Sequence, residues 1–143
     1  MSSPISIKIK LLNPHVMPKK AFTTDAGWDI FATCSQILAP GECAAIPVGI
    51  SVAIPPGYCI VLKERSGLAL KNSLRIGGGV IDSSYRGEIK AIVHNLSPNM
   101  FQITEGMKIA QKLVLPVPEV TFVPVDNLDE TARGDGGFGS SGL

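Results

Sequence analysis

The sequence predicts an all-β fold, a barrel or jelly roll with one short helix, and three observations indicate it. Of 143 residues, 15 are glycine and 11 are proline, and so many helix-breaking residues exclude a helical bundle. Short apolar runs rich in Ile and Val alternate with turn-forming residues along most of the chain. The hydrophobic fraction of 45% is enough for one core, so we expect one globular domain.

The first predicted strand covers residues 5–11. Isoleucine or leucine occupies every odd position of this run, and serine or lysine every even one, so one face is apolar and the other is solvated. Similar apolar runs predict further strands at residues 43–54, 58–62, 88–96, 108–117 and 120–125. The turns between them contain Pro40-Gly41, Pro55-Pro56-Gly57, Gly77-Gly78-Gly79, Ser97-Pro98-Asn99 and Glu105-Gly106.

The only predicted helix covers residues 66–73, where Ser66 is a candidate N-cap and Leu68 to Lys71 are good helix formers. After Val125 the apolar pattern stops, and seven of the last eleven residues are Gly or Ser. Such a segment cannot build a core of its own. We therefore predict a domain over residues 1–125 and a flexible, Gly-rich C-terminal arm over residues 126–143.

Charge and hydropathy narrow the expected partners. Thirteen basic and twelve acidic residues leave a net charge of +1, without a run of like charges, so neither nucleic acid nor a membrane surface is an expected partner. No stretch has the length of a membrane span, and the first residues do not read as a signal peptide. We expect an intracellular protein, cytoplasmic or nuclear.

The cysteines do not indicate a metal site or a disulfide framework. Cys34, Cys43 and Cys59 are odd in number and form no CxxC pair, and the two histidines, His15 and His94, are far apart in sequence. Reduced thiols packed as small apolar side chains are the expectation.

Arg65-Ser66-Gly67 is the first candidate site, because a guanidinium, a hydroxyl and free N–H groups at a helix start suit a phosphate. An ordinary helix cap beside a surface arginine explains the same residues. Glu64 directly precedes this segment, and an acid there would repel a phosphate unless it points away or pairs with a cation such as Lys63.

A second candidate lies in the tail, from Arg133 to Gly142. Its glycines would let the backbone approach an anion, while Phe138 offers a flat face for a base. A disordered tail has the same composition.

Two further segments carry acids. Asp82 follows Val80 and Ile81 in a turn-like run from Gly77 to Gly87, where it is either a partly buried base or a cap of its own turn. Asp25 and Asp29 flank Ala26-Gly27-Trp28 and could ligate or orient a hard cation, although an Asx-turn explains either one equally well.

Taken together, these segments resemble the five motifs of the homotrimeric dUTPases, in the family's order and across nearly the whole chain. The matching segments are Asp25-Ala26-Gly27-Trp28-Asp29, Arg65-Ser66-Gly67-Leu68-Ala69, Gly79-Val80-Ile81-Asp82-Ser83-Ser84-Tyr85-Arg86-Gly87, Ile109-Ala110-Gln111 and Arg133-Gly134-Asp135-Gly136-Gly137-Phe138-Gly139-Ser140-Ser141-Gly142. The resemblance implies a distorted jelly-roll subunit, a homotrimer with active sites shared between chains, and Mg²⁺ as cofactor. It also implies hydrolysis of dUTP to dUMP and diphosphate, which limits uracil incorporation into DNA and supplies dUMP for thymidylate synthesis.

The resemblance also implies roles for single residues. Asp82 would be the general base that activates water, and Asp29 would lie near Mg²⁺ through its water shell, with the ion held mostly by the triphosphate. The implied phosphate-binding residues are Arg65, Ser66, Gly67, Gln111, Arg133, Gly139, Ser140 and Ser141. The implied uracil- and deoxyribose-binding residues are Gly79, Val80, Ile81, Asp82, Tyr85, Lys90 and Phe138.

Three alternatives compete with this interpretation. A related dCTP deaminase would share the fold but needs different groups around the amino carbon of the base. A dUTPase-like interaction module would sense the nucleotide with weak turnover, and the arm would change a partner surface on binding. A purely structural jelly roll leaves the ordered set of polar motifs unexplained.

Overall fold

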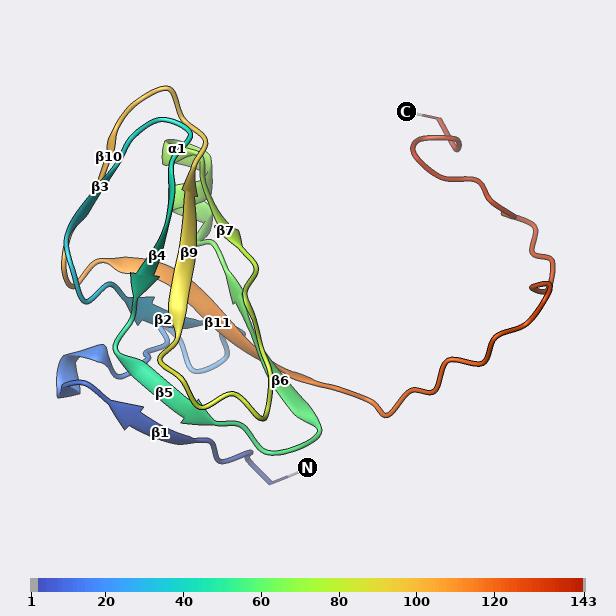
Figure 1. Ribbon diagram of the computed structural model, residues 1–143, viewed down its shortest axis with the longest axis horizontal. Helices are drawn as coiled ribbons and strands as arrows, with labels where there is room; N and C mark the ends of the chain where they lie inside the picture. Colours follow the sequence, from blue (N-terminus) through green and yellow to red (C-terminus); the bar gives the residue numbers. More distant parts are fainter. Residues whose placement is uncertain (1–2, 143) are drawn as a thin grey trace.

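The computed structural model describes residues 3–142, which form a β-rich body followed by an extended C-terminal segment (Figure 1). Its helices are the 3-10 helix η1 (Pro14–Val16) and α1 (Ser66–Asn72). Its strands are β1 (Lys8–Leu11), β2 (Trp28–Phe31), β3 (Gln36–Leu38), β4 (Cys43–Pro47), β5 (Ile50–Ala53), β6 (Tyr58–Lys63), β7 (Leu74–Gly77), β8 (Val80–Ile81), β9 (Lys90–Asn95), β10 (Phe101–Ile103) and β11 (Lys108–Pro116). The predicted mainly β fold with one short α-helix is confirmed.

The strands pair antiparallel in four small sheets. The largest has the order β2-β11-β6-β8, and a three-stranded sheet has the order β4-β9-β7. Two two-stranded sheets, β1-β5 and β3-β10, complete the body. Neighbours within the sheets are mostly far apart in sequence, so the sheets bring distant motifs side by side.

Branched aliphatic side chains from all four sheets form one core. The largest fully buried ones are Ile30, Leu38, Ile46, Ile50, Ile54, Ile60, Leu74, Ile89, Ile103, Ile109, Val48 and Val93. The buried side chain of Asn95 links two segments at the edge of the core. Its Nδ2 donates to the carbonyls of Leu38 at 3.0 Å and Asn99 at 2.8 Å. This bond pattern satisfies an amide that would otherwise be costly to bury.

Several helices and strands begin or end at residues other than the predicted ones. The predicted run 43–54 divides into β4 and β5, because Gly49 has a φ of +70° and bends the chain. The N-cap lies one residue earlier than predicted: it is Arg65, without a side-chain capping bond, and Ser66 is already helical. The prediction of Ser66 as N-cap is therefore wrong. β2, β3, β7, β8 and β10 were not predicted, because runs of two to four residues give little periodicity.

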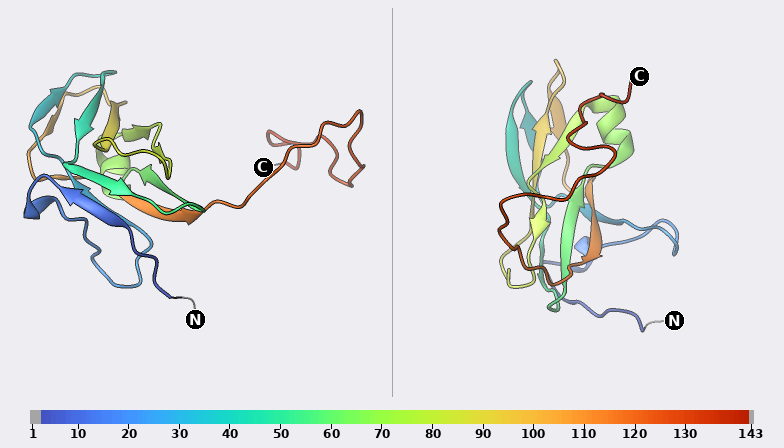
Figure 2. Two further views of the ribbon diagram at one scale, coloured as in Figure 1. Left: turned by 60° about the horizontal axis from the view of Figure 1, so that its bottom comes forward. Right: turned by 90° about the vertical axis from the view of Figure 1, so that its right-hand side faces the viewer.

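The predicted strand at residues 120–125 is wrong for the single chain. β11 ends at Pro116, and every residue from 117 to 135 is exposed. Figure 1 and the left view of Figure 2 show this segment running away from the body. A strand needs a neighbour to pair with, and residues 120–125 have none among residues 3–142.

Two expectations about composition can be compared with the structure. All three cysteines are free, as expected, and Cys34 and Cys59 are partly buried. Cys43 is exposed, so the expectation that it packs as an apolar side chain is wrong. Among the described residues, no helix is both long and apolar enough to cross a membrane.

Candidate active site

β11 organises the first hollow, because it lies between β2 and β6. Gln111 on β11 faces Asp29 on one side and Lys63 on the other in the strand register. The chain continues from Lys63 through Glu64 into Arg65-Ser66-Gly67, where α1 begins. The sheet thereby gathers Asp29, Arg65 and Gln111 from three distant segments. The hollow is lined by Ala21, Asp25, Ala26, Gly27, Asp29, Arg65, Ser66, Gly67 and Gln111.

Asp29 carries the strongest electrostatic contacts in this hollow. Its Oδ1 lies 3.2 Å from Nε of Arg65, and its Oδ2 lies 3.4 Å from Nζ of Lys108. The Asp29 side chain is 16% exposed, so these pairs are less screened by water than pairs on the open surface. Two cations face this one carboxylate, and Asp25 adds a second carboxylate to the lining of the hollow.

Gln111 is fixed from two sides. Its Nε2 donates to the backbone carbonyl of Glu64 at 3.0 Å. Its Oε1 lies so close to Gly27 that a Cβ at that position would collide with it. Glycine is therefore required at position 27 for the observed position of the Gln111 amide.

A second hollow surrounds the segment that follows β7. β8 pairs with β6, and the backbone of Gly79 accepts a hydrogen bond from Leu62 N at 2.8 Å. Gly79 has a φ of +96°, and a Cβ there would lie 2.9 Å from the Leu62 carbonyl oxygen, so a side chain would push this segment off β6. The hollow is lined by Ala45, Val80, Ile81, Asp82, Tyr85, Glu88, Ile89, Lys90 and Ile92.

Asp82 and Tyr85 lie in the tight loop after β8. The Tyr85 N–H donates to the carbonyl of Asp82 at 3.1 Å, and the Tyr85 hydroxyl donates to the carbonyl of Glu88 at 3.0 Å. Nη1 of Arg86 donates to the carbonyl of Ser83 at 2.6 Å. These local bonds close the loop with backbone carbonyls, so the exposed Asp82 carboxylate stays free of side-chain partners among the described residues.

The arm forms a third, separate hollow, lined by Arg133, Gly136, Gly137, Phe138, Gly139, Ser140 and Ser141. Nε of Arg133 donates to the carbonyl of Gly136 at 2.8 Å, which curls the glycines around the guanidinium. Phe138 is fully exposed, so its ring has no packing partner in the described part of the chain, and its backbone has a φ of +53°.

The single chain thus divides the predicted site residues into three groups. Asp29, Arg65, Ser66, Gly67 and Gln111 share the first hollow. Val80, Ile81, Asp82, Tyr85 and Lys90 share the second, with Gly79 at its edge, and Arg133, Phe138, Gly139, Ser140 and Ser141 share the third. No one hollow of the described residues joins all three groups.

Asp25 and Asp29 are the acids that the sequence suggested as ligands of a cation. Oδ2 of Asp25 accepts a hydrogen bond from Phe22 N at 3.0 Å, so Asp25 caps its own turn. Asp29 already faces two cations, and the described residues contain no group of three or more metal-ligating side chains. This donor set fits an Mg²⁺ ion that a triphosphate and water hold, with Asp29 as an outer partner, and does not fit an all-protein cage.

Lys108 lies beside the first hollow, and the sequence did not reveal its contact with Asp29. Strand alternation would place Lys108 and Gln111 on opposite faces, but the register shifts between Lys108 and Ala110. This β-bulge lets the Lys108 side chain reach Asp29, opposite Gln111. No signal in one sequence predicts the bulge. Glu88 and Ile92 also line a hollow that was not predicted to include them.

Comparison with known proteins adds an independent line of evidence. A family model described as dUTPase matches residues 13–142. The deoxyuridine 5'-triphosphate nucleotidohydrolase of Clostridium tetani is 44% identical over 96% of this chain and 97% of its own. That of Gloeothece citriformis is 42% identical over 94% of both chains. A solved structure of the Staphylococcus bacteriophage 80alpha dUTPase, a single-residue variant with dUpNHpp, has a TM-score of 0.88 at 30% identity and covers 96% of this chain and 99% of its own.

Proposed function

Since the chain belongs to the dUTPase family and hydrolyses dUTP, we propose that it forms dUMP and diphosphate in homotrimers whose active sites are shared between chains. The observation that carries this proposal is the division of the site residues over three hollows. A nucleotide that needs all three groups is served only where different chains each contribute one. Hydrolysis would limit uracil incorporation into DNA and supply dUMP for thymidylate synthesis.

Exposed apolar surface supports the assembly. The segment after β11 exposes Val120, Phe122, Val123 and Val125, and the Phe122 side chain is 91% exposed. The body has an apolar hollow of its own, and the described part of this chain does not fill it. It is lined by Ile5, Ile7, Ile9, Met17, Pro18, Lys20, Trp28, Lys112 and Val114. A second copy can cover both surfaces at once, and would also cover strand edges.

The hairpin hollow would bind the base and sugar. Main-chain groups from Gly79 to Tyr85, with the Lys90 backbone, would pair with uracil, and a narrow slot would exclude the methyl group of thymine by collision. Cytosine would present mismatched donors and acceptors. The Tyr85 ring would pack under deoxyribose, where a 2′-hydroxyl would collide.

Asp82 would be the general base. Its carboxylate is exposed at the edge of this hollow and free of side-chain partners among the described residues, so it can accept a proton from water. The activated water would attack the α-phosphorus in line with the leaving diphosphate. A positioned base of this kind contributes about 10²–10⁴-fold to a rate.

The first hollow would hold the phosphates. Arg65, Ser66, Gly67 and Gln111 would donate to phosphate oxygens, and Asp29 would orient water around the cation. When bound, Mg²⁺ neutralises charge on the triphosphate and stabilises the leaving diphosphate. The dUTPase of phage phi11 of S. aureus, 28% identical over 88% of this chain, has a described structural Mg(II) ion.

The arm would close the site. Arg133 and the backbone from Gly139 to Ser141 would contact the γ-phosphate, and Phe138 would stack over uracil. We retain the division at residues 125 and 126, with 117–125 packed on a neighbouring chain and 126–143 as the closing arm. Nucleotide contacts would offset the entropy lost when the arm becomes ordered.

The test of this function measures diphosphate release from dUTP, dTTP, dCTP and UTP in the presence of Mg²⁺. Release from dUTP alone is expected, and loss of that activity on chelation of Mg²⁺ would support the cofactor. Release of ammonia from dCTP would instead indicate a deaminase. Tight dUTP binding with negligible release would indicate a nucleotide-sensing module.

A further inference from the structure

Glu64 lies at the junction between the phosphate hollow and the strand that leads to the hairpin. Its Oε2 accepts a hydrogen bond from the Ile76 N–H on β7 at 3.1 Å, and its Oε1 lies 3.4 Å from Nζ of Lys63. The side chain is only 20% exposed and does not line the phosphate hollow. The carboxylate therefore points away from the place where a phosphate would bind, and it pairs with a cation.

The same residue is held at its backbone. The Glu64 carbonyl accepts from Nε2 of Gln111 at 3.0 Å. One end of Glu64 is thus tied to β11 and the other end to β7, which is the edge strand of its sheet. These two bonds fix the orientation of the peptide that enters Arg65.

The turn at Arg65 needs such support. Arg65 is the N-cap of α1 and makes no side-chain capping bond, so the usual device that fixes a helix start is missing. Gly67, two residues after Arg65, adds a position without a side chain in the first turn of α1. Within the described residues, the contacts of this turn include the Arg65–Asp29 pair, the two Glu64 bonds, and the first helical hydrogen bond, from Ala69 N to the Arg65 carbonyl at 2.9 Å.

The electrostatics agree with a carboxylate that stays ionised. Burial by itself raises the pKa of Glu64, but the hydrogen bond from the Ile76 N–H and the nearby Lys63 ammonium outweigh it, so the net pKa is lowered. An ionised acceptor makes the stronger bond to a backbone N–H. Its charge is also largely compensated before it can act on a bound phosphate.

We infer that Glu64 is a positioning residue for triphosphate binding, and that its hydrogen bond to Ile76 holds the Arg65-Ser66-Gly67 segment in its binding conformation. The inference rests on the proposed function of that segment. It concerns the outer phosphates more than the base, because Glu64 directly precedes Arg65, whereas β7, which leads to the hairpin, is also held by its pairing with β9. Loss of the bond would weaken the binding of ligands that carry the full triphosphate. The binding of ligands that rely mainly on the hairpin would change little.

The experiment compares Glu64→Ala, Glu64→Asp and Glu64→Gln in the full chain. Alanine removes the acceptor, aspartate keeps the charge on a shorter side chain that cannot reach Ile76 N, and glutamine keeps the acceptor oxygen without the charge. Glu42→Ala is the matched control, because Oε2 of Glu42 also accepts a backbone N–H at 3.1 Å, from Ala39, outside all three hollows. The ligands are dUMP and a non-hydrolysable dUTP analogue with nitrogen between the α- and β-phosphorus.

We expect Glu64→Ala and Glu64→Asp to lower the affinity for the triphosphate analogue about tenfold and to raise the KM for dUTP by a similar factor. The affinity for dUMP should change less than about twofold. Glu64→Gln should bind the triphosphate analogue more tightly than Glu64→Ala and Glu64→Asp, and Glu42→Ala should match the wild type in its affinity for both ligands. Equal weakening of both ligands, wild-type behaviour of Glu64→Asp, or failure of Glu64→Gln to rescue would overturn the inference. Wild-type chain that releases no diphosphate from dUTP would instead contradict the proposed function. If Glu64→Ala does not fold, the comparison of Glu64→Asp with Glu64→Gln in affinity for the triphosphate analogue tests the inference.

Discussion

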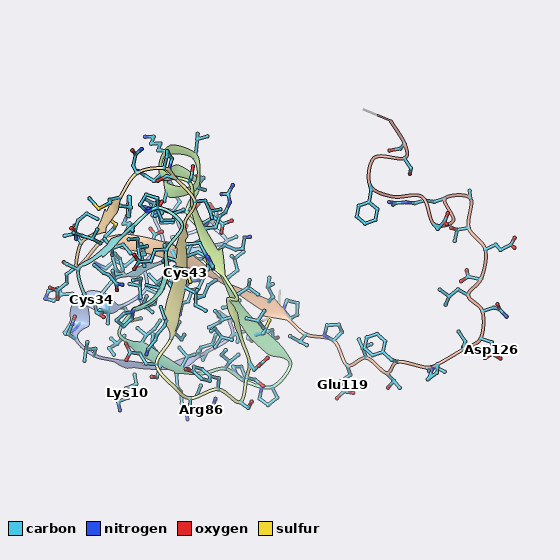
Figure 3. The ribbon with its side chains drawn as sticks, turned by 45° about the horizontal axis from the view of Figure 1, so that its top comes forward. Lys10, Cys34, Cys43, Arg86, Glu119 and Asp126 are labelled. Carbon is cyan, nitrogen blue, oxygen red and sulfur yellow. The ribbon has the colours of Figure 1, made fainter. Side chains whose placement is uncertain are left out.

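The body and the C-terminal segment differ in what holds them in place. Side chains such as Ile46, Leu38 and Ile103 are completely buried in the body, whereas no residue from 117 to 142 is buried. Figure 3 shows Glu119 and Asp126 on the extended segment, away from the body. The body is therefore held by its own contacts, whereas the described part of the segment after β11 buries nothing against the body. The proposed site takes groups from both regions.

The largest effect should come from the base in the body. Asp82→Asn keeps the shape of the loop but removes the proton acceptor, so nucleotide affinity should stay close to wild type. Turnover should fall by about 10²–10⁴-fold, which corresponds to about 3–5 kcal/mol of barrier. Steady-state kinetics and binding of the non-hydrolysable analogue measure the two quantities. An unaffected rate would remove Asp82 as the base.

A pair of apolar truncations contrasts the two regions directly. Ile46→Ala leaves a cavity in the body and should lower the free energy of unfolding by about 2–5 kcal/mol at any protein concentration. Phe122→Ala removes a side chain that has no partner within the chain, so its effect should appear only where subunits associate. Denaturation at two protein concentrations distinguishes the effects of the two variants on the free energy of unfolding. A concentration-independent loss in Phe122→Ala would show that the segment packs on its own body.

Removal of the arm should separate folding from turnover. A chain that ends at Thr131 lacks Arg133 and Phe138 but keeps the body and residues 117–125. We expect a folded trimer with turnover reduced by about 10–100-fold, because closure and the γ-phosphate contacts are lost. Sedimentation and kinetics on the same sample measure both. Loss of the trimer would contradict the division at residues 125 and 126.

The smallest effect concerns Lys112, which is only 7% exposed in the apolar hollow of the body. Burial lowers its pKa to about 8, below the model-compound value of 10.5. The unfolded chain binds more protons between these values, so stability should rise as the pH increases from about 8 to 10.5. Below pH 8 Lys112 is charged in the folded protein, so the full free-energy cost of burying its ammonium group is present.

Lys112→Met replaces the ammonium with an apolar side chain of similar volume and should raise the free energy of unfolding by about 1–3 kcal/mol at pH 7. The difference from the wild type should vanish near pH 10.5. Thermal unfolding across this pH range checks it. A loss of stability at pH 7 would show that a second copy supplies Lys112 with an acidic partner.

The sequence predicted those parts of the fold that depend on local pattern. The long strands β6, β9 and β11 follow from their Ile- and Val-rich runs, and α1 follows from its helix formers. Every predicted site residue lies in or beside one of three hollows. The pattern was also strand-like at residues 120–125, but a strand needs a partner, and the described residues provide none there.

What the sequence did not predict depends on contacts between distant segments. Lys108 reaches Asp29 through a β-bulge, and the Glu64 carboxylate turns toward Ile76, twelve residues further along the chain. Both facts depend on strand register, which no short motif encodes. The direction of the Glu64 side chain decides whether that acid repels phosphate or supports its binding.

The central claim is that one active site takes its base and its arm from different chains. The most direct measurement mixes Asp82→Asn chains with chains that end at Thr131, unfolds and refolds them together, and measures dUTP turnover. Random assortment should restore about a quarter of wild-type activity per site, because half of the bases and half of the arms are intact and they combine independently. Activity no higher than the average of the two separate variants would contradict shared sites and place base and arm on one chain.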